Sequence, residues 1–221
     1  MKIAIDGPAG AGKSTISKGA AKRLGFVYID TGAMYRAIGL AAVRRGIDTK
    51  DAEGVKAILS EVEVSIKHSA DGQQIFLNGE NVSEEIRLPE ISVAASNVAV
   101  IPEVRLKLVE LQRSLAEKED VIMDGRDIGT YVLPDAEVKV FLTASVEERA
   151  KRRLKELMEK GVETTLEEVQ ADMEYRDKND SGRAFAPLKE AEDRIRVDNT
   201  YLTIDEAIEQ ICALAKSRRD V

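Results

Sequence analysis

The chain has 221 residues, 43% of them hydrophobic, and carries a formal net charge of −7. Its length and apolar content suffice for one domain around a hydrophobic core. The excess of acidic residues disfavours nucleic acid or an anionic membrane as a partner, although local arginines can still bind a small anion.

A single cysteine, Cys212, excludes an internal disulfide and lies in an apolar helical pattern, so we expect it in the core. With one histidine, His68, a transition-metal cluster is disfavoured. No run approaches the ~20 apolar residues of a membrane span, and the chain opens on a predicted strand rather than a signal peptide. We therefore expect a cytoplasmic protein.

The first predicted strand, Lys2 to Asp6, leads into a phosphate-binding loop. Residues 7–14 fit the pattern G-x-x-x-x-G-K-[ST], and a helix is predicted from Lys13 to Leu24. Backbone N–H groups of such a loop cradle phosphate oxygens, Lys13 can reach the β and γ phosphates, and Ser14 can ligate Mg²⁺. The predicted ATP-binding residues are Gly7, Pro8, Ala9, Gly10, Ala11, Gly12, Lys13, Ser14 and Thr15.

The second predicted strand, Phe26 to Asp30, precedes a predicted helix from Ala33 to Arg45. Residues 30–36, which end this strand and enter the helix, include Thr31 and Arg36, which can hold a second anion opposite the phosphate loop. A simpler interpretation is that Thr31 caps the helix and Arg36 is a surface charge.

An antiparallel insertion is predicted at about residues 60–90. Alternating runs at Val62–Ile66 and Gln74–Leu77 are joined by a segment that contains a turn at Asp71-Gly72. A second tight turn at Asn78-Gly79 leads to a short third run at Glu80–Val82.

One long helix is predicted from Ile91 to Leu115, followed by a strand from Val121 to Asp124. Apolar residues ending in an aspartate are typical of a Walker B strand, whose carboxylate orients Mg²⁺ directly or through water. Arg126 and Asp127 then follow at the carboxyl end of this strand. They are candidate site residues, or alternatively a surface ion pair on a turn.

The last part of the chain is predicted to hold two more strands, Val138–Leu142 and Ile195–Val197. Capping boxes open three helices, at Ser145–Glu148, Thr165–Glu168 and Thr203–Glu206, and Gly161 is a stop signal. The basic helical hairpin that ends in residues 176–183 suits a lid over a polyphosphate, or alternatively a solvated charged surface. Alternating strands and helices predict a parallel α/β sheet whose ligands bind beyond the carboxyl ends of the strands.

Together these segments resemble the nucleoside monophosphate kinases, and within that family the bacterial cytidylate kinases. The resemblance spans essentially the whole chain, including the phosphate loop, residues 30–36, 124–130 and 176–183, and Ala186-Pro187-Leu188. It implies a three-layer P-loop NTPase fold with a five-stranded parallel sheet. One domain, 1–221, would hold a CMP-binding region at 31–118, with the small β insertion, and a helical lid at 149–184.

The resemblance also implies roles for individual residues. Arg36, Arg126 and Arg183 would bind phosphates, while Thr31, Arg105 and Asp127 would recognise cytosine. Arg176 and Asp180 would contact the ribose, and Tyr35 would line the pocket. Lys13, Arg126, Arg176 and Arg183 would act in catalysis, and Ser14 and Asp124 would hold the metal, Asp124 through water. The sequence alone would place Arg105 on an exposed helix surface.

The implied reaction is transfer of the γ-phosphoryl group of ATP to CMP or dCMP, assisted by Mg²⁺, in a monomer. The attacking phosphate oxygen is already anionic near neutral pH, so that no general base is needed. A carboxylate such as Asp127 accepts from the amine of cytosine and repels the carbonyl of uracil. Two alternatives stay open: a kinase for UMP, AMP or shikimate, and a nucleotide-binding switch. The switch is disfavoured because no Asn-Lys-x-Asp motif is present.

Overall fold

The computed structural model describes residues 1–69, 72–159 and 161–219. Its main sheet has five parallel strands in the order β2–β6–β1–β7–β8. They are β1 Lys2–Asp6, β2 Val27–Asp30, β6 Val121–Gly125, β7 Val138–Thr143 and β8 Ile195–Asp198. The predicted parallel α/β fold is confirmed. Each observed strand matches its prediction to within one residue at either end.

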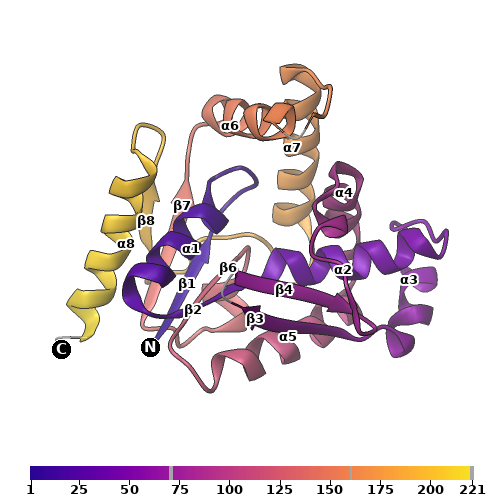
Figure 1. Ribbon diagram of the computed structural model, residues 1–221, viewed down its shortest axis with the longest axis horizontal. Coiled ribbons are helices and arrows are strands. Elements are labelled where there is room, and N and C mark those ends of the chain that lie inside the picture. The colour runs from indigo at the N-terminus through magenta and orange to yellow at the C-terminus, as the bar shows by residue number, and fades with distance from the viewer. Residues whose placement is uncertain (70–71, 160, 220–221) are drawn as a thin grey trace.

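Helices cover both faces of this sheet (Figure 1). Ile3 and Ile5 of β1 pack in one apolar cluster with α1 (Lys13–Leu24) and α8 (Ile204–Arg219). Ala4, which points to the other face, packs in a second cluster with α2 (Thr31–Arg44) and α5 (Pro102–Ala116). Cys212 of α8 is only 2% exposed within the first cluster, as the apolar pattern predicted.

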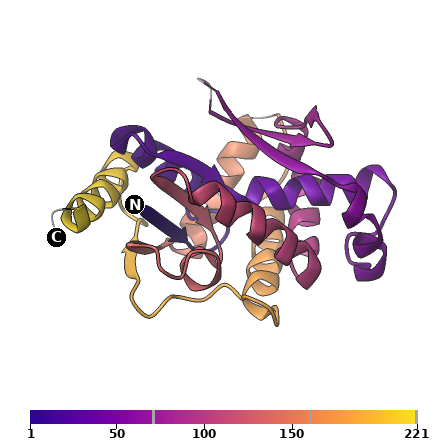
Figure 2. The same cartoon turned by 90° about the horizontal axis from the view of Figure 1, so that it is seen from below.

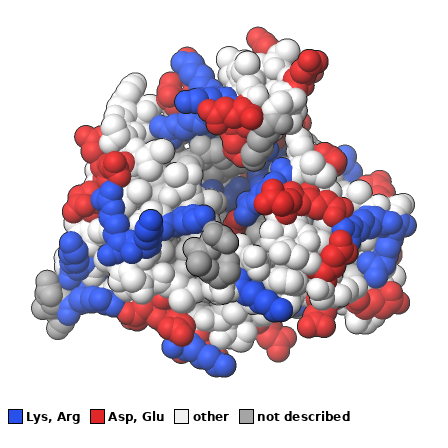
Figure 3. All heavy atoms as spheres, viewed as in Figure 1, with Lys and Arg blue, Asp and Glu red and all other residues white. Residues whose placement is uncertain are grey.

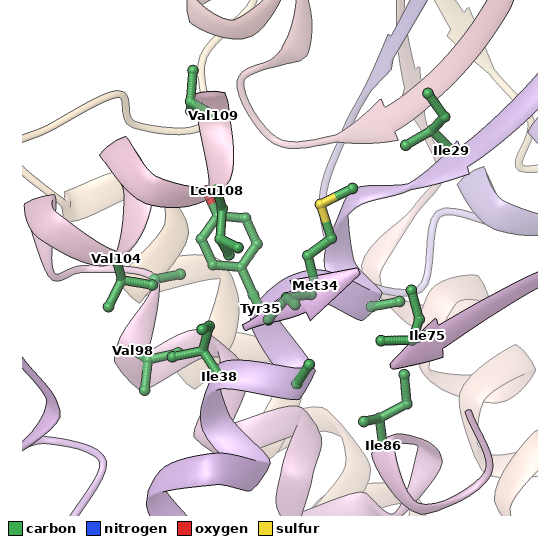
Figure 4. Packing of buried hydrophobic residues seen from close by; sticks show 14 of the residues in the cluster. Ile29, Met34, Tyr35, Ile38, Ile75, Ile86, Val98, Val104, Leu108 and Val109 are labelled. Carbon is green, nitrogen blue, oxygen red and sulfur yellow. The ribbon is translucent and has the colours of Figure 1, made fainter. Parts of the chain in front are cut away.

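The second cluster is built around α2 (Figure 4). Met34, Tyr35 and Ile38 of this helix are at most 9% exposed. They lie among side chains of α4 (Pro89–Val98), α5 and the small sheet. This packing fixes the orientation of α2, which carries Thr31 and Arg36 at its N-terminal end.

The predicted insertion forms a three-stranded antiparallel sheet of β3 (Val64–Ser69), β4 (Gly72–Leu77) and β5 (Glu80–Asn81). It lies over α2 and away from α8 (Figure 2). Helix α3 (Ala52–Ile58) and the short turns η1 (Leu59–Glu61) and η2 (Glu85–Arg87) flank it.

The first strand of the insertion starts two residues later than predicted. Asn78 and Gly79 form the predicted tight turn with φ values of 49° and 83°. Of the other predicted turn, at Asp71-Gly72, Asp71 lies outside the described residues.

The insertion also covers the open edge of the main sheet at β2. His68 and Gln73 face each other across β3 and β4. The His68 Nε2 atom lies 3.1 Å from the backbone oxygen of Tyr28. The Gln73 side chain accepts a hydrogen bond from the backbone N–H of Asp30 at 2.9 Å and donates one to its carbonyl at 3.3 Å. The side chains of His68 and Gln73 thus contact backbone polar groups at the end of β2 that a further strand would otherwise bind.

Two of the predicted helices are wrong in their bounds. The single helix expected at 91–115 is two helices, α4 and α5, because Pro102 has no backbone N–H and forces Ile101 into an extended conformation. Helix α2 starts at Thr31, two residues early, because the Asp30 carboxylate accepts from the N–H of Ala33. The interpretation of Thr31 as the helix cap is therefore wrong.

Above the carboxyl ends of the strands, α6 (Val146–Glu159) and α7 (Leu166–Gly182) form a helical hairpin with its own small apolar cluster (Figure 1). The capping boxes at Thr165 and Thr203 form in both directions. At Ser145 only half of the box forms, because the Ser145 N–H donates to Thr200 instead. No described helix is both long and apolar enough to cross a bilayer.

We expect Gln73→Ala to lower the free energy of unfolding by about 1 kcal/mol, because the Asp30 N–H, on a residue only 6% exposed, loses its acceptor. Urea unfolding measures the change. The matched control is Gln74→Ala, on the opposite face of the same strand. Equal losses in the two variants would contradict the role given to Gln73.

Candidate active site

A cavity of about 660 Å³ lies at the carboxyl ends of the strands, beneath α6 and α7. Figure 3 shows the corresponding hollow with basic side chains at its floor. Sixteen of the predicted site residues line it: Gly10, Ala11, Gly12, Lys13, Ser14, Thr15, Thr31, Tyr35, Arg36, Arg105, Asp124, Arg126, Asp127, Arg176, Asp180 and Arg183. Gly7, Pro8 and Ala9, which the motif also predicted, are not among the lining residues.

The phosphate loop begins against β7. A Cβ atom at Gly7 would lie 2.0 Å from the carbonyl oxygen of Leu142, so only glycine fits there. The Lys13 ammonium, 7% exposed, donates to the carbonyls of Gly7 and Pro8 at 2.8 Å each. Burial and the nearby Arg126 lower the pKa of Lys13 well below its usual value. An anion bound in the loop would restore the charge of this ammonium.

Asp124, at the end of β6, is the point where three segments meet. Its carboxylate accepts from Ser14 Oγ at 3.0 Å and from the Tyr28 hydroxyl at 2.9 Å. Its backbone carbonyl accepts from Thr31 Oγ1 at 2.7 Å. Burial, together with the charge of Asp30, raises the pKa of Asp124 to about 7. A cation next to this carboxylate would favour its ionised form.

Ser14 and Asp124 provide oxygen ligands of the kind that Mg²⁺ prefers. In the described part of the chain no three His, Cys, Asp or Glu side chains are grouped for a metal. Mg²⁺ typically takes one or two protein carboxylates and completes its shell with water and substrate phosphates. One hydroxyl and one carboxylate 3.0 Å apart, beside the phosphate loop, fit this mode of binding.

On the opposite side of the cavity, Arg105 and Asp127 form a buried ion pair, in which Arg105 is 1% and Asp127 3% exposed. Arg183 donates to the same carboxylate at 3.3 Å. The guanidinium of Arg105 also lies 5.4 Å from the ring centre of Tyr35. Arg105 is thus not the exposed helix arginine that the sequence alone suggests.

Arg126 pairs with a residue distant in sequence. Its Nε donates to the Asp180 carboxylate at 2.7 Å, and Arg183 approaches the same carboxylate at 3.7 Å. The alternative interpretation of Arg126 and Asp127 as a surface ion pair is wrong, because their partners come from α7, α5 and the segment after α7.

Two arginines in the cavity, both half-buried, have no carboxylate partner among the described residues. Arg36 donates only to Ser92 Oγ at 2.8 Å and to the carbonyl of Ile86 at 3.3 Å. The side chain of Arg176 forms no hydrogen bond or ion pair with any described residue. Burial and the charge of Arg176 lower the pKa of Arg36 to about 9, and burial and the charge of Arg126 lower the pKa of Arg176 to about 10. Two such guanidinium groups favour an anionic ligand in the cavity.

Sequence reasoning missed several residues that shape this site. The Asp6 carboxylate accepts from the N–H groups of Ile128 and Gly129 at 2.8 Å each, and so fixes the turn η3 (Ile128–Val132) after Asp127. Burial raises the pKa of Asp6 to about 6 despite these bonds. Asn199 donates to the carbonyl of Ala11 at 2.9 Å. The position of Asp6 at a strand end, next to the loop motif, was the one available signal.

The remaining missed residues line the cavity. Arg87 comes from the insertion and pairs with Asp30 at 3.0 Å. Arg152 and Arg153 come from α6, and Leu202 and Ile204 from the segment at the start of α8. These residues have no motif around them and are brought in by the tertiary fold.

The fold and the site together define a P-loop kinase, with a phosphate loop at the end of β1 and a separate anion site on the facing elements. A gluconokinase from Sinorhizobium meliloti has a similar fold, with a TM-score of 0.52 and 15% identity over 99% of this chain and 94% of that one.

The comparison by sequence is more specific. The family model described as cytidylate kinase matches residues 3–217. Cytidylate kinases from Caldicellulosiruptor saccharolyticus and Carboxydothermus hydrogenoformans are 54% and 48% identical to this chain. The match to the Caldicellulosiruptor protein covers 97% of this chain and 95% of the relative. The match to the Carboxydothermus protein covers 100% of both chains. The chain belongs to the cytidylate kinase family.

The raised pKa of Asp124 predicts a pH-dependent stability. Between the unfolded pKa of 3.8 and the folded value of about 7, the folded state holds a proton that the unfolded chain has lost. The contribution of Asp124 to the free energy of unfolding of the wild type is therefore lost as the pH rises through about 7. The loss is at most about 1.4 kcal/mol per pH unit.

Asp124→Asn removes this titration and keeps a polar side chain toward Ser14 and Tyr28. Its unfolding free energy relative to wild type should rise between pH 5 and 7 and level off above pH 8, as measured by urea titration at each pH. The matched control for the loss of one carboxylate is Asp135→Asn at an exposed position. A relative stability of Asp124→Asn that falls across this range would disprove the assignment.

Proposed function

We propose that this chain transfers the γ-phosphoryl group of ATP to CMP or dCMP, giving ADP and CDP or dCDP, with Mg²⁺ as the cofactor. The observation that carries the proposal is one cavity that joins a phosphate loop, two half-buried arginines without a carboxylate partner among the described residues, and the Arg105–Asp127 pair. Because one cavity of this chain is lined by the residues proposed for both substrates, we propose that the protein acts as a monomer.

The base-recognition role of Asp127 is supported by its surroundings. The buried carboxylate lines the cavity and forms ion pairs with Arg105 and Arg183. It would accept from the exocyclic amine of cytosine. In the same place uracil presents a carbonyl oxygen, which leaves two acceptors facing each other without a proton. Thr31 and Arg105 are proposed to bind the other polar atoms of the base, with Tyr35 lining the pocket.

The phosphate-binding roles follow the distribution of positive charge. Arg36, Arg126 and Arg183 are proposed to bind the phosphate of CMP, while Arg176 and Asp180 contact its ribose. The residues of the phosphate loop would bind ATP on the other side. In this proposal residues 31–118 form the CMP-binding region, and residues 149–184 form a lid.

The chemistry needs positioning and charge neutralisation rather than a proton acceptor. The attacking phosphate oxygen is anionic, and the transition state spreads charge over the transferred group. Lys13 and the arginines 126, 176 and 183 would neutralise that charge. Ser14 and, through water, Asp124 would hold Mg²⁺, which neutralises further charge on the phosphates when bound. Closure of the lid would exclude water as a competing acceptor.

The direct test is ADP release from ATP and Mg²⁺ with CMP, dCMP, UMP, AMP and shikimate offered separately. Strong stimulation by CMP and dCMP, with UMP far behind, is expected. Stimulation by a different acceptor would keep the kinase and reject the cytosine pocket. ADP release that no acceptor stimulates would instead favour a nucleotide-binding switch.

Lys13→Ala should lower the turnover number at least about 100-fold and change the affinity for CMP by less than about threefold, because Lys13 lies on the donor side. Steady-state kinetics gives kcat, and calorimetric titration gives CMP affinity. The matched control is Lys22→Ala, an exposed lysine of the same helix. Comparable turnover in the Lys13→Ala variant and wild type would refute the role of Lys13.

Asp127→Asn should shift the ratio of kcat/KM for CMP to that for UMP toward UMP by about 10-fold or more, because an amide can donate to the uracil oxygen. Two substrates compared on one variant cancel any loss of folded protein. An unchanged ratio would mean that Asp127 does not recognise the base.

A further inference from the structure

Two charged residues of the helical hairpin bind the backbone of a single residue in the phosphate loop. Arg149 of α6 donates from Nη1 to the Ala9 carbonyl at 2.7 Å and to the Asp177 carboxylate at 2.7 Å. The other oxygen of Asp177, on α7, accepts from the Ala9 N–H at 3.0 Å. Both backbone polar groups of Ala9 are thus held by an ion pair outside the phosphate-binding face of the loop.

This contact is buried and closely packed. Ala9 is 1% and Arg149 5% exposed. At the next residue, Gly10, a Cβ atom would lie 2.9 Å from Met173 Cε of α7 and 3.2 Å from Arg149 Cβ. Its φ of 71° also disfavours any residue but glycine. The tip of the loop therefore has little freedom to move independently of the two helices.

The same helix, α7, reaches the acceptor side of the cavity. Arg176 precedes Asp177 in sequence and lines the cavity, and Asp180 pairs with Arg126. From another side of the helix, the Tyr175 hydroxyl donates to Asn97 of α4 at 2.8 Å. A displacement of α7 would thus shift the phosphate loop and the acceptor arginine together.

The charges of the pair matter as well as its hydrogen bonds. Asp177 is close enough to Arg126 and Arg176 to favour their protonated forms. An unpaired carboxylate at that place would repel the polyphosphate of the donor. Arg149 neutralises it while leaving both oxygens bonded.

We propose that Arg149 and Asp177 are positioning residues for the phosphoryl transfer, and this rests on the function proposed above. They fix the Ala9 peptide, and through it the direction of the loop N–H groups. Because α7 also carries Arg176, the pair fixes the position of the donor phosphates relative to this arginine on the acceptor side. Neither residue contacts a substrate in this role, and Arg149 additionally shields the donor from the charge of Asp177.

This arrangement predicts unequal effects of neutralising the two partners. Arg149→Gln leaves the Asp177 charge unpaired, and should raise KM for ATP about 10-fold or more with KM for CMP changed less than threefold. Asp177→Asn keeps an acceptor for the Ala9 N–H, and should leave KM for ATP unchanged or lower. The double variant should recover most of the loss in KM for ATP, because the repelling charge is gone.

Steady-state kinetics on wild type, the two single variants and the double variant tests this directly. The matched control is Lys151→Met, which removes an exposed cation of α6 that pairs with Glu147 and Glu148. A double variant with a KM for ATP equal to or above that of Arg149→Gln would overturn the proposal. So would an Arg149→Gln variant that behaves like Lys151→Met.

If Arg149→Gln does not fold, Arg149→Lys provides the second measurement. It keeps the charge and loses the forked geometry, so kcat should fall about threefold or more while KM for ATP stays near wild type. Kinetics that match Lys151→Met in both constants would again reject the proposal. Absence of CMP-stimulated ADP release in wild type would instead reject the proposed function, which keeps the two failures distinct.

Discussion

Burial of the Asp124 carboxylate at the carboxyl end of β6 is the constraint on which the site depends. A buried carboxylate is costly unless its oxygens are hydrogen-bonded. Ser14 of α1 and Tyr28 of β2 supply those bonds, and Thr31 of α2 binds the carbonyl of the same residue. Three elements that begin or end at this edge are thereby fixed relative to one another. The phosphate loop and helix α2 are therefore both attached to Asp124.

The positive charge of the cavity is unfavourable in the free protein, and a bound anionic ligand would offset this free energy. Arg36, Arg176 and Lys13 all have pKa values lowered by burial, which means that their charged forms are destabilised in the free protein. A bound phosphate would instead favour the charged forms of these side chains. The net charge of −7 therefore says little about the ligand, because the local field at the floor of the cavity is opposite to that of the whole chain.

Local patterns in the sequence predicted most of the fold and the motif residues, because strands, caps and the phosphate loop are encoded by neighbours in the chain. The break at Pro102 was missed because apolar spacing continues across it, although proline chemistry carries the signal. Arg105 was interpretable only through the family resemblance. Its partner Asp127 lies 22 residues away, and its burial comes from tertiary packing. The contact of Arg149, which spans 140 residues, had no local pattern, and the contact of Asp6, which spans 122 residues, had only its position at a strand end as a signal.

In the proposed function, recognition of the base and neutralisation of phosphate charge are not independent, because their residues are linked by ion pairs. Asp127 binds Arg183, Arg183 approaches Asp180, and Asp180 binds Arg126. A base that presents a carbonyl to Asp127 would repel that carboxylate and disturb the arginine that it holds. In the proposed function, the penalty for the wrong base therefore reaches the groups around the transferred phosphate. Selectivity built this way acts on the transition state as well as on binding, so that discrimination is expressed in kcat and not in KM alone.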